Sequence, residues 1–304
     1  MKIDRRKALA LLGLGAAGSA AAKPAKGGVS FNHGVASGDP RQDRVILWTR
    51  ITPDQPGGDI AYSWKLNPVD RRAGGAKVGS GVTGPSRDYT VKVDAGGLDA
   101  GRAYTFEFQA GGVTSPMGRT RTLPAGATKD VVIAVASCAL YPNGYFNAYQ
   151  AIADLKRVDL VLHLGDYLYE YGGPKGYGED STVAKGRSHA PPHELLSLPD
   201  YRQRHAQYKT DPGLQAAHAR APWIVAWDDH ETCNDSYSDG AQNHQPATEG
   251  DWSARKARAL KAYYEWMPIR EPAKGVSMAE AGARSFLRNP STSTLPSTGA
   301  MSRS

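Results

Sequence analysis

The sequence predicts a mixed fold, in which an all-β domain is followed by an α/β domain. Over residues 31–122, apolar and polar residues alternate with a period of two between Gly, Pro and Asp clusters, which is typical of a β-sandwich. After residue 129, short apolar runs are separated by a stretch with helical spacing, which indicates an α/β sheet. A chain of 304 residues is long enough for two domains that each bury a core.

The first 25 residues have the pattern of an export signal. Arg5 and Arg6 precede an apolar segment, residues 8–22, and the Ala-rich stretch around Ala22 and Ala25 offers a cleavage site. The apolar segment is too short to span a bilayer comfortably, so we expect no permanent membrane anchor. The Arg pair indicates the twin-arginine export machinery as a partner, and therefore a bacterial protein that is exported to the periplasm or the cell exterior.

The predicted β-sandwich covers residues 31–122. The segment that ends at Tyr104, with Leu98 and Asp99 at its start, resembles the tyrosine corner of immunoglobulin and fibronectin sandwiches, in which the phenol bonds to nearby backbone. His33 and Asp39 have side chains that can bind metal ions. Because this domain carries no other clustered chemistry, we predict turn and packing roles for both.

Three apolar runs after a linker at 124–127 predict core strands of the α/β domain. They cover residues 130–137, 159–164 and 223–227, and helical spacing over 145–156 lies between the first two. A strand, a helix and a second strand in this order form a unit that is expected to be parallel and right-handed. The residues that follow the first two strands should therefore meet at one edge of the sheet.

Each predicted strand ends in residues that can bind a metal ion. Cys138 follows the first strand, Asp166 and Tyr169 follow the second, and Asp229 and His230 follow the third. Open α/β sheets bind ligands at the carboxyl ends of their strands. Taken alone, Asp166 and Tyr169 would fit a capped turn and a packed ring equally well. The three strand ends together favour a metal site.

These strand ends resemble those of the PhoD-like alkaline phosphatases, a branch of the calcineurin-like metallophosphoesterases. The start of the predicted sandwich also resembles the start of family members. The matching segments are Phe31-Asn-His-Gly-Val-Ala-Ser-Gly-Asp-Pro40, Ala136-Ser-Cys138, Gly165-Asp-Tyr-Leu-Tyr-Glu170 and Trp227-Asp-Asp-His-Glu231. The resemblance implies a metallophosphatase domain over residues 129–286, behind an N-terminal immunoglobulin/fibronectin-like β-sandwich.

The resemblance also implies two kinds of metal ion and one catalytic residue. Cys138, Asp166 and Tyr169 would bind Fe³⁺, while Asp166 and Asp229 would face Ca²⁺, a division that suits the hardness of the ligands. His230 would orient the phosphate or protonate the leaving oxygen, because an imidazole whose pKa lies near neutral pH can do either.

The residues around the third strand end have weaker assignments. The Asn234 carbonyl suits calcium, but a turn role is as probable. We interpret Asp228 and Glu231 as groups that fix the catalytic histidine and the metal ligands. Two cysteines in an exported protein would allow a disulfide, but the position of Cys138 beside the site favours a ligand role, and we expect Cys233 to be structural.

The remaining histidines are predicted to have no role in the site. His189 and His193 fall in a Gly/Pro-rich segment, residues 171–193, that is typical of a long active-site loop, and we expect both at the surface. His205 and His218 fall in a helical segment that should cover the sheet, and we expect them on helix surfaces.

The C-terminal part of the sequence departs from the family pattern. Family members complete the site with further His and Asp ligands from a C-terminal half, and residues 287–304 instead form a Ser/Thr/Pro-rich stretch that predicts a disordered tail. We therefore expect a truncated or frame-shifted member with an incomplete, partial α/β metallophosphoesterase sandwich domain. Apolar surface should be exposed where further strands would cover the sheet.

The resemblance implies metal-dependent hydrolysis of phosphomonoesters or phosphodiesters, of the alkaline phosphatase D kind, outside the cytoplasm. The substrate would be a small phosphoester or a cell-envelope component, and the purpose would be phosphate scavenging. The alternatives are an inactive truncated member and an exported binding module carried by the β-sandwich. A net charge of +7 fits an anionic substrate as well as an ordinary globular protein. We predict no nucleic-acid partner, because no basic tract is interleaved with aromatic residues.

Overall fold

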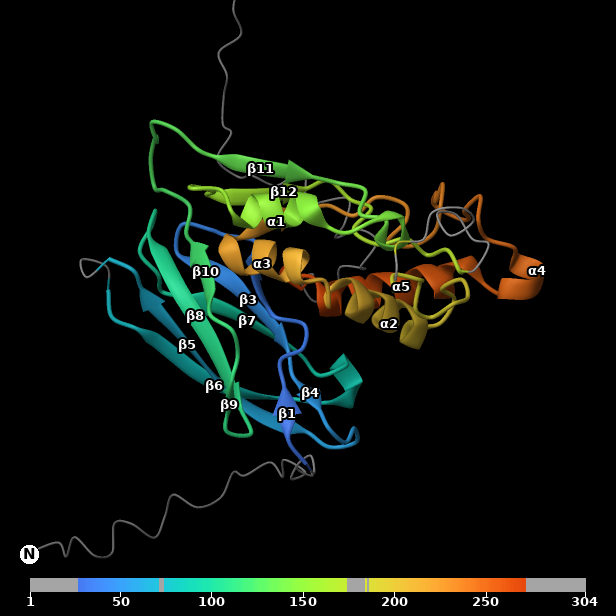
Figure 1. Cartoon of the computed structure of the whole chain (residues 1–304), viewed down its shortest axis with the longest axis horizontal. Helices are drawn as coiled ribbons and strands as arrows, with labels where there is room; N and C mark the ends of the chain where they lie inside the picture. Colours follow the sequence, from blue (N-terminus) through green and yellow to red (C-terminus); the bar gives the residue numbers. More distant parts are fainter. Residues whose placement is uncertain (1–26, 71–73, 174–183, 185, 272–304) are drawn as a thin grey trace, which may run out of the picture.

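The computed structural model describes residues 27–70, 74–173, 184 and 186–271 (Figure 1). The predicted signal sequence and tail lie outside these residues, as does most of the central part of the predicted active-site loop. The strands are β1 (Val29–Ser30), β2 (Val35–Gly38), β3 (Arg44–Arg50), β4 (Thr52–Pro53), β5 (Ile60–Pro68), β6 (Lys77–Thr83), β7 (Thr90–Gly96), β8 (Ala103–Ala110), β9 (Val113–Thr114), β10 (Gly118–Arg121), β11 (Ile133–Ala136), β12 (Leu160–His163) and β13 (Trp223–Val225). The helices are α1 (Asn147–Ala153), α2 (Leu198–Tyr208), α3 (Pro212–Arg220), α4 (Pro246–Glu249) and α5 (Trp252–Trp266).

The N-terminal part is a β-sandwich, as the alternating pattern predicts. One of its sheets has the order β10-β8-β5-β6, with β9 beside β8, and the other layer is formed by β2, β3 and β7 (Figure 1). Buried side chains from both layers fill the space between them, among them Val35, Leu47, Leu66, Val91 and Phe106. Removal of this apolar surface from water is the main force that holds the two layers together.

Three details of the sandwich confirm the sequence predictions. The Tyr104 hydroxyl accepts a hydrogen bond from the backbone N–H of Asp99 at 2.9 Å, which is the predicted tyrosine corner. His33 is buried and packs edge-on against Trp266, with ring centroids 5.2 Å apart. Asp39 occupies a left-handed turn conformation with φ 44°. Both residues thus have turn and packing roles.

The six-stranded sheet runs through both predicted domains, which the sequence does not anticipate. Its order is β11-β12-β13-β2-β3-β7, so strands of the sandwich continue the sheet of the α/β part. The junction is the parallel pair Trp223 and Gly38, and the N–H of Asp39 donates to the Trp223 carbonyl at 3.0 Å. A Cβ on Gly38 would lie 2.2 Å from the Pro268 carbonyl oxygen, so only glycine fits at this crossing.

The α/β part contains the predicted strand–helix–strand unit. Strands β11, β12 and β13 are parallel, and α1 and α3 pack together on one face of them (Figure 1). Tyr149 of α1 stacks on Trp223 of β13 with ring centroids 6.0 Å apart, inside a core that also includes Val161, Leu214 and Ala217. The strands are shorter than predicted. The first, predicted over 130–137, covers only Ile133–Ala136.

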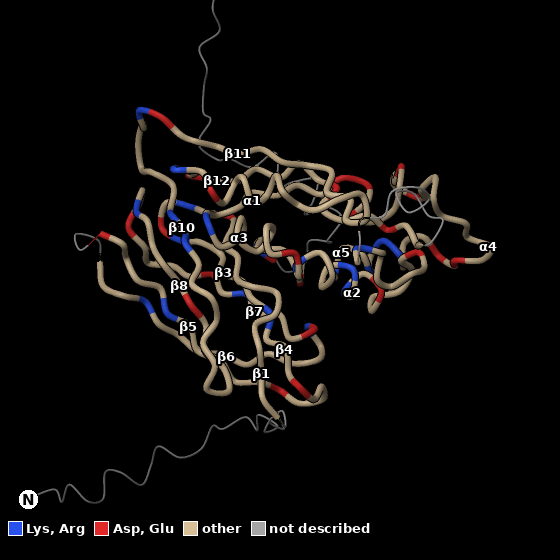
Figure 2. Tube along the Cα trace, in the orientation of Figure 1, with Lys and Arg blue, Asp and Glu red and all other residues tan. Residues whose placement is uncertain are grey.

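The other face of β11, β12 and β13 is apolar and exposed. Val135 pairs with Leu162, which pairs with Ile224, so their side chains form one row across the sheet. Val135 is 59% exposed and Ile224 is 37% exposed, and Ile133 beside them is 48% exposed. Figure 2 shows no charged residue along β11. Exposed apolar surface is thus present where the sequence predicts it.

The predicted surface positions of three histidines are wrong. His189, His205 and His218 are all buried, whereas His193 is exposed as expected. The helix prediction failed here because a helix rich in His, Arg and Tyr resembles a solvated one, although α2 packs against α5 and α3 packs against the sheet. His218 stacks on Trp223 with ring centroids 3.9 Å apart, and burial lowers the pKa of this imidazole well below its ordinary value.

A lysine is buried beside these histidines. Lys209, at the end of α2, is 1% exposed, and its Nζ donates to the Tyr167 hydroxyl at 3.0 Å and lies 3.2 Å from His218 Nε2. The Nζ also lies 4.6 Å from the centroid of the Trp48 ring, on β3 of the sandwich. No carboxylate of the described residues forms an ion pair with it, and burial lowers the pKa of Lys209 to about 7.

No described helix is long and apolar enough to cross a membrane.

Candidate metal centre

The first two predicted ligands lie on neighbouring turns at the carboxyl ends of β11 and β12. Cys138 and Asp166 both have positive φ, 57° and 53°, in the left-handed region that residues with a side chain rarely adopt. Two hydrogen bonds hold the turns together: the N–H of Cys138 donates to the Gly165 carbonyl at 3.2 Å, and the N–H of Ala139 donates to the Asp166 carbonyl at 2.8 Å. Strained residues that are held in this way are common at functional sites.

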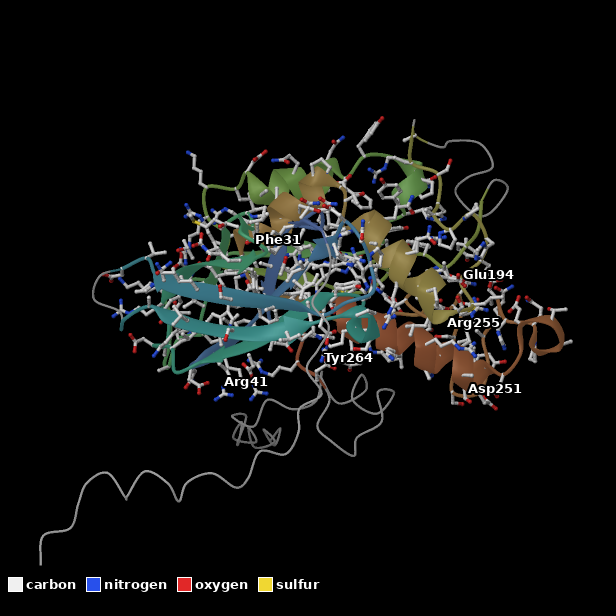
Figure 3. All side chains as sticks on the ribbon, turned by 90° about the horizontal axis from the view of Figure 1, so that it is seen from below. Phe31, Arg41, Glu194, Asp251, Arg255 and Tyr264 are labelled. Atoms are coloured by element: carbon white, nitrogen blue, oxygen red, sulfur yellow. The ribbon has the colours of Figure 1, made fainter. Side chains whose placement is uncertain are left out.

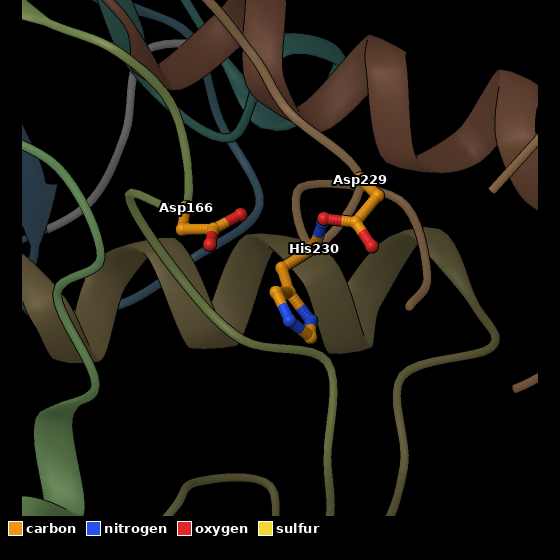
Figure 4. Close-up of side chains that lie close together, drawn as sticks. All are labelled: Asp166, Asp229 and His230. Atoms are coloured by element: carbon orange, nitrogen blue, oxygen red, sulfur yellow. The ribbon is translucent and has the colours of Figure 1, made fainter. Parts of the chain in front are cut away.

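The structure brings the predicted site residues together. Asp166, Asp229 and His230 each offer a ligand atom, and these atoms all lie within 4.8 Å of one another (Figure 4). The Cys138 thiol donates to Asp166 Oδ2 at 3.5 Å, and the Tyr169 hydroxyl donates to the same oxygen at 3.4 Å. Asp166 is thus the residue that the other members of the group surround.

The electrostatics of Asp166 fit a bound cation. Its Oδ1 atom is buried and has no hydrogen-bond partner among the described residues. Burial raises the pKa of Asp166 and outweighs the opposite effects of the His230 charge and the Cys138 hydrogen bond, while the nearby charges of Asp229 and Asp228 also raise it. Burial likewise raises the pKa of the Tyr169 phenol. A metal ion would supply the partner that Oδ1 lacks and would favour the ionised forms of these groups, so the donor set fits a metal ion.

Gly165 allows the turns to approach the segment after β13. Its φ of 109° is unfavourable for any residue with a side chain, and a Cβ at this position would lie 2.5 Å from Asp228 Cβ. Glu231 holds the same two segments together, because it is fully buried and accepts hydrogen bonds from the N–H of Tyr167 at 2.6 Å and from the N–H of Asp228 at 2.8 Å. Burial raises the pKa of Glu231 to about 7.

Glu170, rather than Asp228 or Glu231, holds the His230 ring. Its Oε2 atom lies 2.8 Å from His230 Nδ1, and the Glu170 side chain is fully buried. Burial alone would raise the pKa of Glu170, but the hydrogen bonds from His230 and Asn243 keep it below its ordinary value. Burial would lower the pKa of His230, and Glu170 raises it instead. The interpretation of Asp228 and Glu231 as the groups that fix the histidine is therefore wrong, whereas Glu231 does fix the turns that carry the ligands.

Asn234 and Cys233 lie just behind the site. The N–H of Asn234 donates to Glu170 Oε1 at 2.8 Å, and its side-chain amide donates to Gln242 Oε1 at 2.9 Å, so a calcium-ligand role for Asn234 stays a prediction. Cys233 is buried, and its thiol donates to the Asn243 carbonyl. Both cysteines are free, which agrees with a structural Cys233 that is not bonded to Cys138.

Sequence reasoning missed two residues of this site. Glu170 belongs to a segment that the sequence singled out, but its spacing gave it no role. Asn243 lies far along the next loop and donates to Glu170 Oε1 at 2.9 Å. No local pattern could have found Asn243, because only the folded loop brings it back to the strand ends.

The fold and the site define the class of the protein: an α/β protein with a candidate metal centre built from carboxylates and an imidazole at the ends of parallel strands. The comparisons then place it in a family. The profile of the PhoD-like phosphatase matches residues 133–286, and that of the PhoD-like phosphatase N-terminal domain matches residues 17–124. The chain belongs to the PhoD-like phosphatase family.

Two relatives show how far the similarity extends. Alkaline phosphatase D of Bacillus subtilis (strain 168) is 40% identical over 248 residues, which cover 79% of this chain and 41% of that protein. A solved structure of PhoD matches with a TM-score of 0.71 and 38% identity, over 82% of this chain and 48% of that one. The chain thus spans less than half of the length of either relative.

Proposed function

We propose that this chain hydrolyses phosphoesters, either monoesters or diesters, at the centre formed by Asp166, Asp229 and His230. The observation that carries the proposal is the buried, unpartnered Oδ1 atom of Asp166 beside a second carboxylate and an imidazole. Membership of the family, and the similarity to a protein named alkaline phosphatase D, support the reaction class. The substrate would be a small phosphoester or a phosphoester of the cell envelope, used as a source of phosphate.

The proposed ions are Fe³⁺ and Ca²⁺. Cys138, Asp166 and Tyr169 would hold the iron, since a thiolate and a phenolate suit Fe³⁺, and Asp166 with Asp229 would face the calcium, with Asn234 as a further candidate. Bound ions would neutralise phosphate oxygens and lower the pKa of a bound water. His230 would donate a proton to the leaving oxygen from Nε2, because Glu170 occupies its Nδ1. Glu170 also keeps the pKa of His230 raised, which favours the proton-donating form.

A second candidate is a family member without activity that binds through its β-sandwich. The observation that favours it is the small number of oxygen ligands, since calcium takes 6–8 oxygens and the cluster of described residues supplies carboxylates from Asp166 and Asp229 alone. Activity separates the two candidates. We expect slow turnover of an aryl phosphate in the presence of Fe³⁺ and Ca²⁺.

The decisive experiment compares the chain with Asp166→Asn, which keeps the shape of the side chain but weakens metal binding. The matched control is Glu194→Gln, which alters a partly buried carboxylate that pairs with Arg255 at 2.7 Å (Figure 3). Hydrolysis that chelators stop, that Asp166→Asn abolishes and that Glu194→Gln retains would support the proposal. Equal rates in the chain and in Asp166→Asn would contradict it.

The iron assignment has a readout that does not need turnover. A thiolate or phenolate on Fe³⁺ gives visible absorption, so protein loaded with iron should be coloured. Cys138→Ser should shift or weaken this band, and Tyr169→Phe should do the same. Purified, iron-treated protein that holds no iron by elemental analysis and shows no band would rule out Fe³⁺ as the ion.

We also propose that the protein is exported to the periplasm or the cell exterior by the twin-arginine machinery. The motivation is Arg5-Arg6 before a weakly apolar segment. Replacement of both by Lys should leave an uncleaved precursor in the cytoplasm, as seen by fractionation and immunoblotting. Normal export of the double variant, trimmed near Ala22, would argue against this route.

A further inference from the structure

Glu170 is surrounded in a way that fixes the roles of its two oxygens. Oε1 accepts two hydrogen bonds from nitrogen donors that cannot act as acceptors: the backbone N–H of Asn234 at 2.8 Å and the side-chain amide of Asn243 at 2.9 Å. Oε2 faces His230 Nδ1 at 2.8 Å. The side chain is 0% exposed, so no water competes for these positions.

We propose that Glu170 is a positioning residue for the proposed hydrolysis, on which this inference rests: it holds a proton on Nδ1 of His230, so that Nε2 is the nitrogen that exchanges a proton with the substrate. Neutral imidazole carries one N–H, and a carboxylate oxygen can only accept, so the proton between His230 and Glu170 belongs to Nδ1. The tautomer of His230 is thereby set by a residue that touches neither the metal nor the substrate.

The ring is held in orientation as well as in tautomer. Tyr169 packs against His230 in a tilted arrangement with ring centroids 4.2 Å apart, and Tyr171 lies against it at 5.3 Å. A half-turn of the ring would replace Nδ1 by a carbon atom opposite Glu170 and would leave a buried carboxylate oxygen without its donor, which is costly. The two tyrosines and Glu170 therefore favour a single ring position.

The carboxylate itself is anchored to the long helix α5. Asn243 donates to Glu170, and its own carbonyl accepts from the Arg255 guanidinium at 3.0 Å. Arg255 is fully buried and forms an ion pair with Glu194 at 2.7 Å (Figure 3). It forms a second ion pair with Glu249 at 3.0 Å. A continuous set of bonds thus runs from α5 through Asn243 and Glu170 to the imidazole.

The variant Glu170→Gln makes a sharp test, because its amide has only one orientation that satisfies the site. The two donors, Asn234 and Asn243, require the amide oxygen to occupy the position of Oε1. The amide NH₂ then faces His230 Nδ1, which must become an acceptor. We therefore expect the substitution to move the ring proton from Nδ1 to Nε2 while the shape of the side chain is unchanged.

The experiment is nitrogen NMR of ¹⁵N-histidine-labelled protein, at a pH where the rings are neutral, with His230→Asn to assign the signal. The full chain should show His230 as the Nδ1–H tautomer, and Glu170→Gln should show Nε2–H. Glu194→Gln, a matched substitution of a carboxylate that pairs with Arg255 and does not contact His230 or Glu170, should keep Nδ1–H. An Nε2–H tautomer in the unsubstituted chain, or an unchanged tautomer in folded Glu170→Gln, would overturn the proposal.

A kinetic measurement links the tautomer to the reaction. Substitution of a partner that orients a group of a metal centre typically costs roughly 10–100-fold in metal affinity or activity. Glu170→Gln should therefore lower kcat on an aryl phosphate by that factor with little change in KM. If the chain hydrolyses nothing, the proposed function fails, but the NMR result still decides the role of Glu170. If the chain is active and Glu170→Gln retains its full kcat, the positioning role fails alone.

Discussion

Replacement of the buried Lys209 by Met should stabilise the protein, and the gain should depend on pH. Among the residues that the structure describes, the Nζ atom has neutral partners only, the Tyr167 hydroxyl and His218, and it packs over the Trp48 ring. His205, on the same helix, is also held neutral, since burial lowers its pKa. A charged ammonium in these surroundings is therefore uncompensated, and burial lowers its pKa from 10.5 to about 7.

The size of the effect follows from the pKa shift. One pKa unit corresponds to about 1.4 kcal/mol, so a shift from 10.5 to about 7 corresponds to about 5 kcal/mol of unfolding free energy. Between these two pH values the unfolded chain binds a proton that the folded chain does not, so stability rises with pH across the window. Below about pH 7 both states carry the proton, and the full cost is present.

The assay is urea unfolding of the unsubstituted chain and of Lys209→Met at a series of pH values. The gain from Met should be largest near pH 7, at several kcal/mol less the lost hydrogen bonds, and should shrink by about 1.4 kcal/mol per pH unit as the pH rises. Lys261→Met, a substitution of an exposed lysine on α5, is the control and should show no such trend. Parallel stability curves for the chain and for Lys209→Met would refute the reasoning.

Two further predictions concern single groups in the fold. Gly165→Ala forces a Cβ into a left-handed conformation and against Asp228. We therefore expect the free energy of unfolding in urea to fall by roughly 1–3 kcal/mol or more, and calorimetry to show weaker binding of Ca²⁺. Unchanged stability would show that the two turns can move apart. Tyr104→Phe removes the hydrogen bond from Asp99 in the tyrosine corner and should cost about 1 kcal/mol in the same assay, and a variant as stable as the unsubstituted chain would show that the corner adds no net stability.

The local chemistry of the site could be predicted from the sequence, since each candidate ligand lies within a few residues of a strand end. A strand, a helix and a strand in order impose a shared edge, and this places Cys138 beside Asp166 without further information. Tyr104 was predictable for a similar reason, because its bond closes within a few residues. In both cases the pattern and the contact lie in the same short stretch of chain.

What the sequence did not reveal depends on contacts between distant segments. The pairing of Gly38 with Trp223, which joins the two predicted domains, leaves no periodic signal in either strand. The buried position of His205 was hidden because polar residues predict an exposed helix face, although neutral imidazoles stack well in an aromatic core. The role of Glu170 depends on Asn243, whose position is set by the anchoring of its loop to α5.

The sheet that passes through both predicted domains has a consequence for how the molecule comes apart. Because β2 lies between β13 and β3, the sandwich and the α/β part share one sheet. The segment 124–127 therefore does not separate two independent domains. A protease that cuts this segment should produce two fragments that migrate together until a denaturant is added. Heat should melt the described region in a single transition, and the strand ends that carry the candidate metal centre should lose their arrangement at the same temperature as the tyrosine corner.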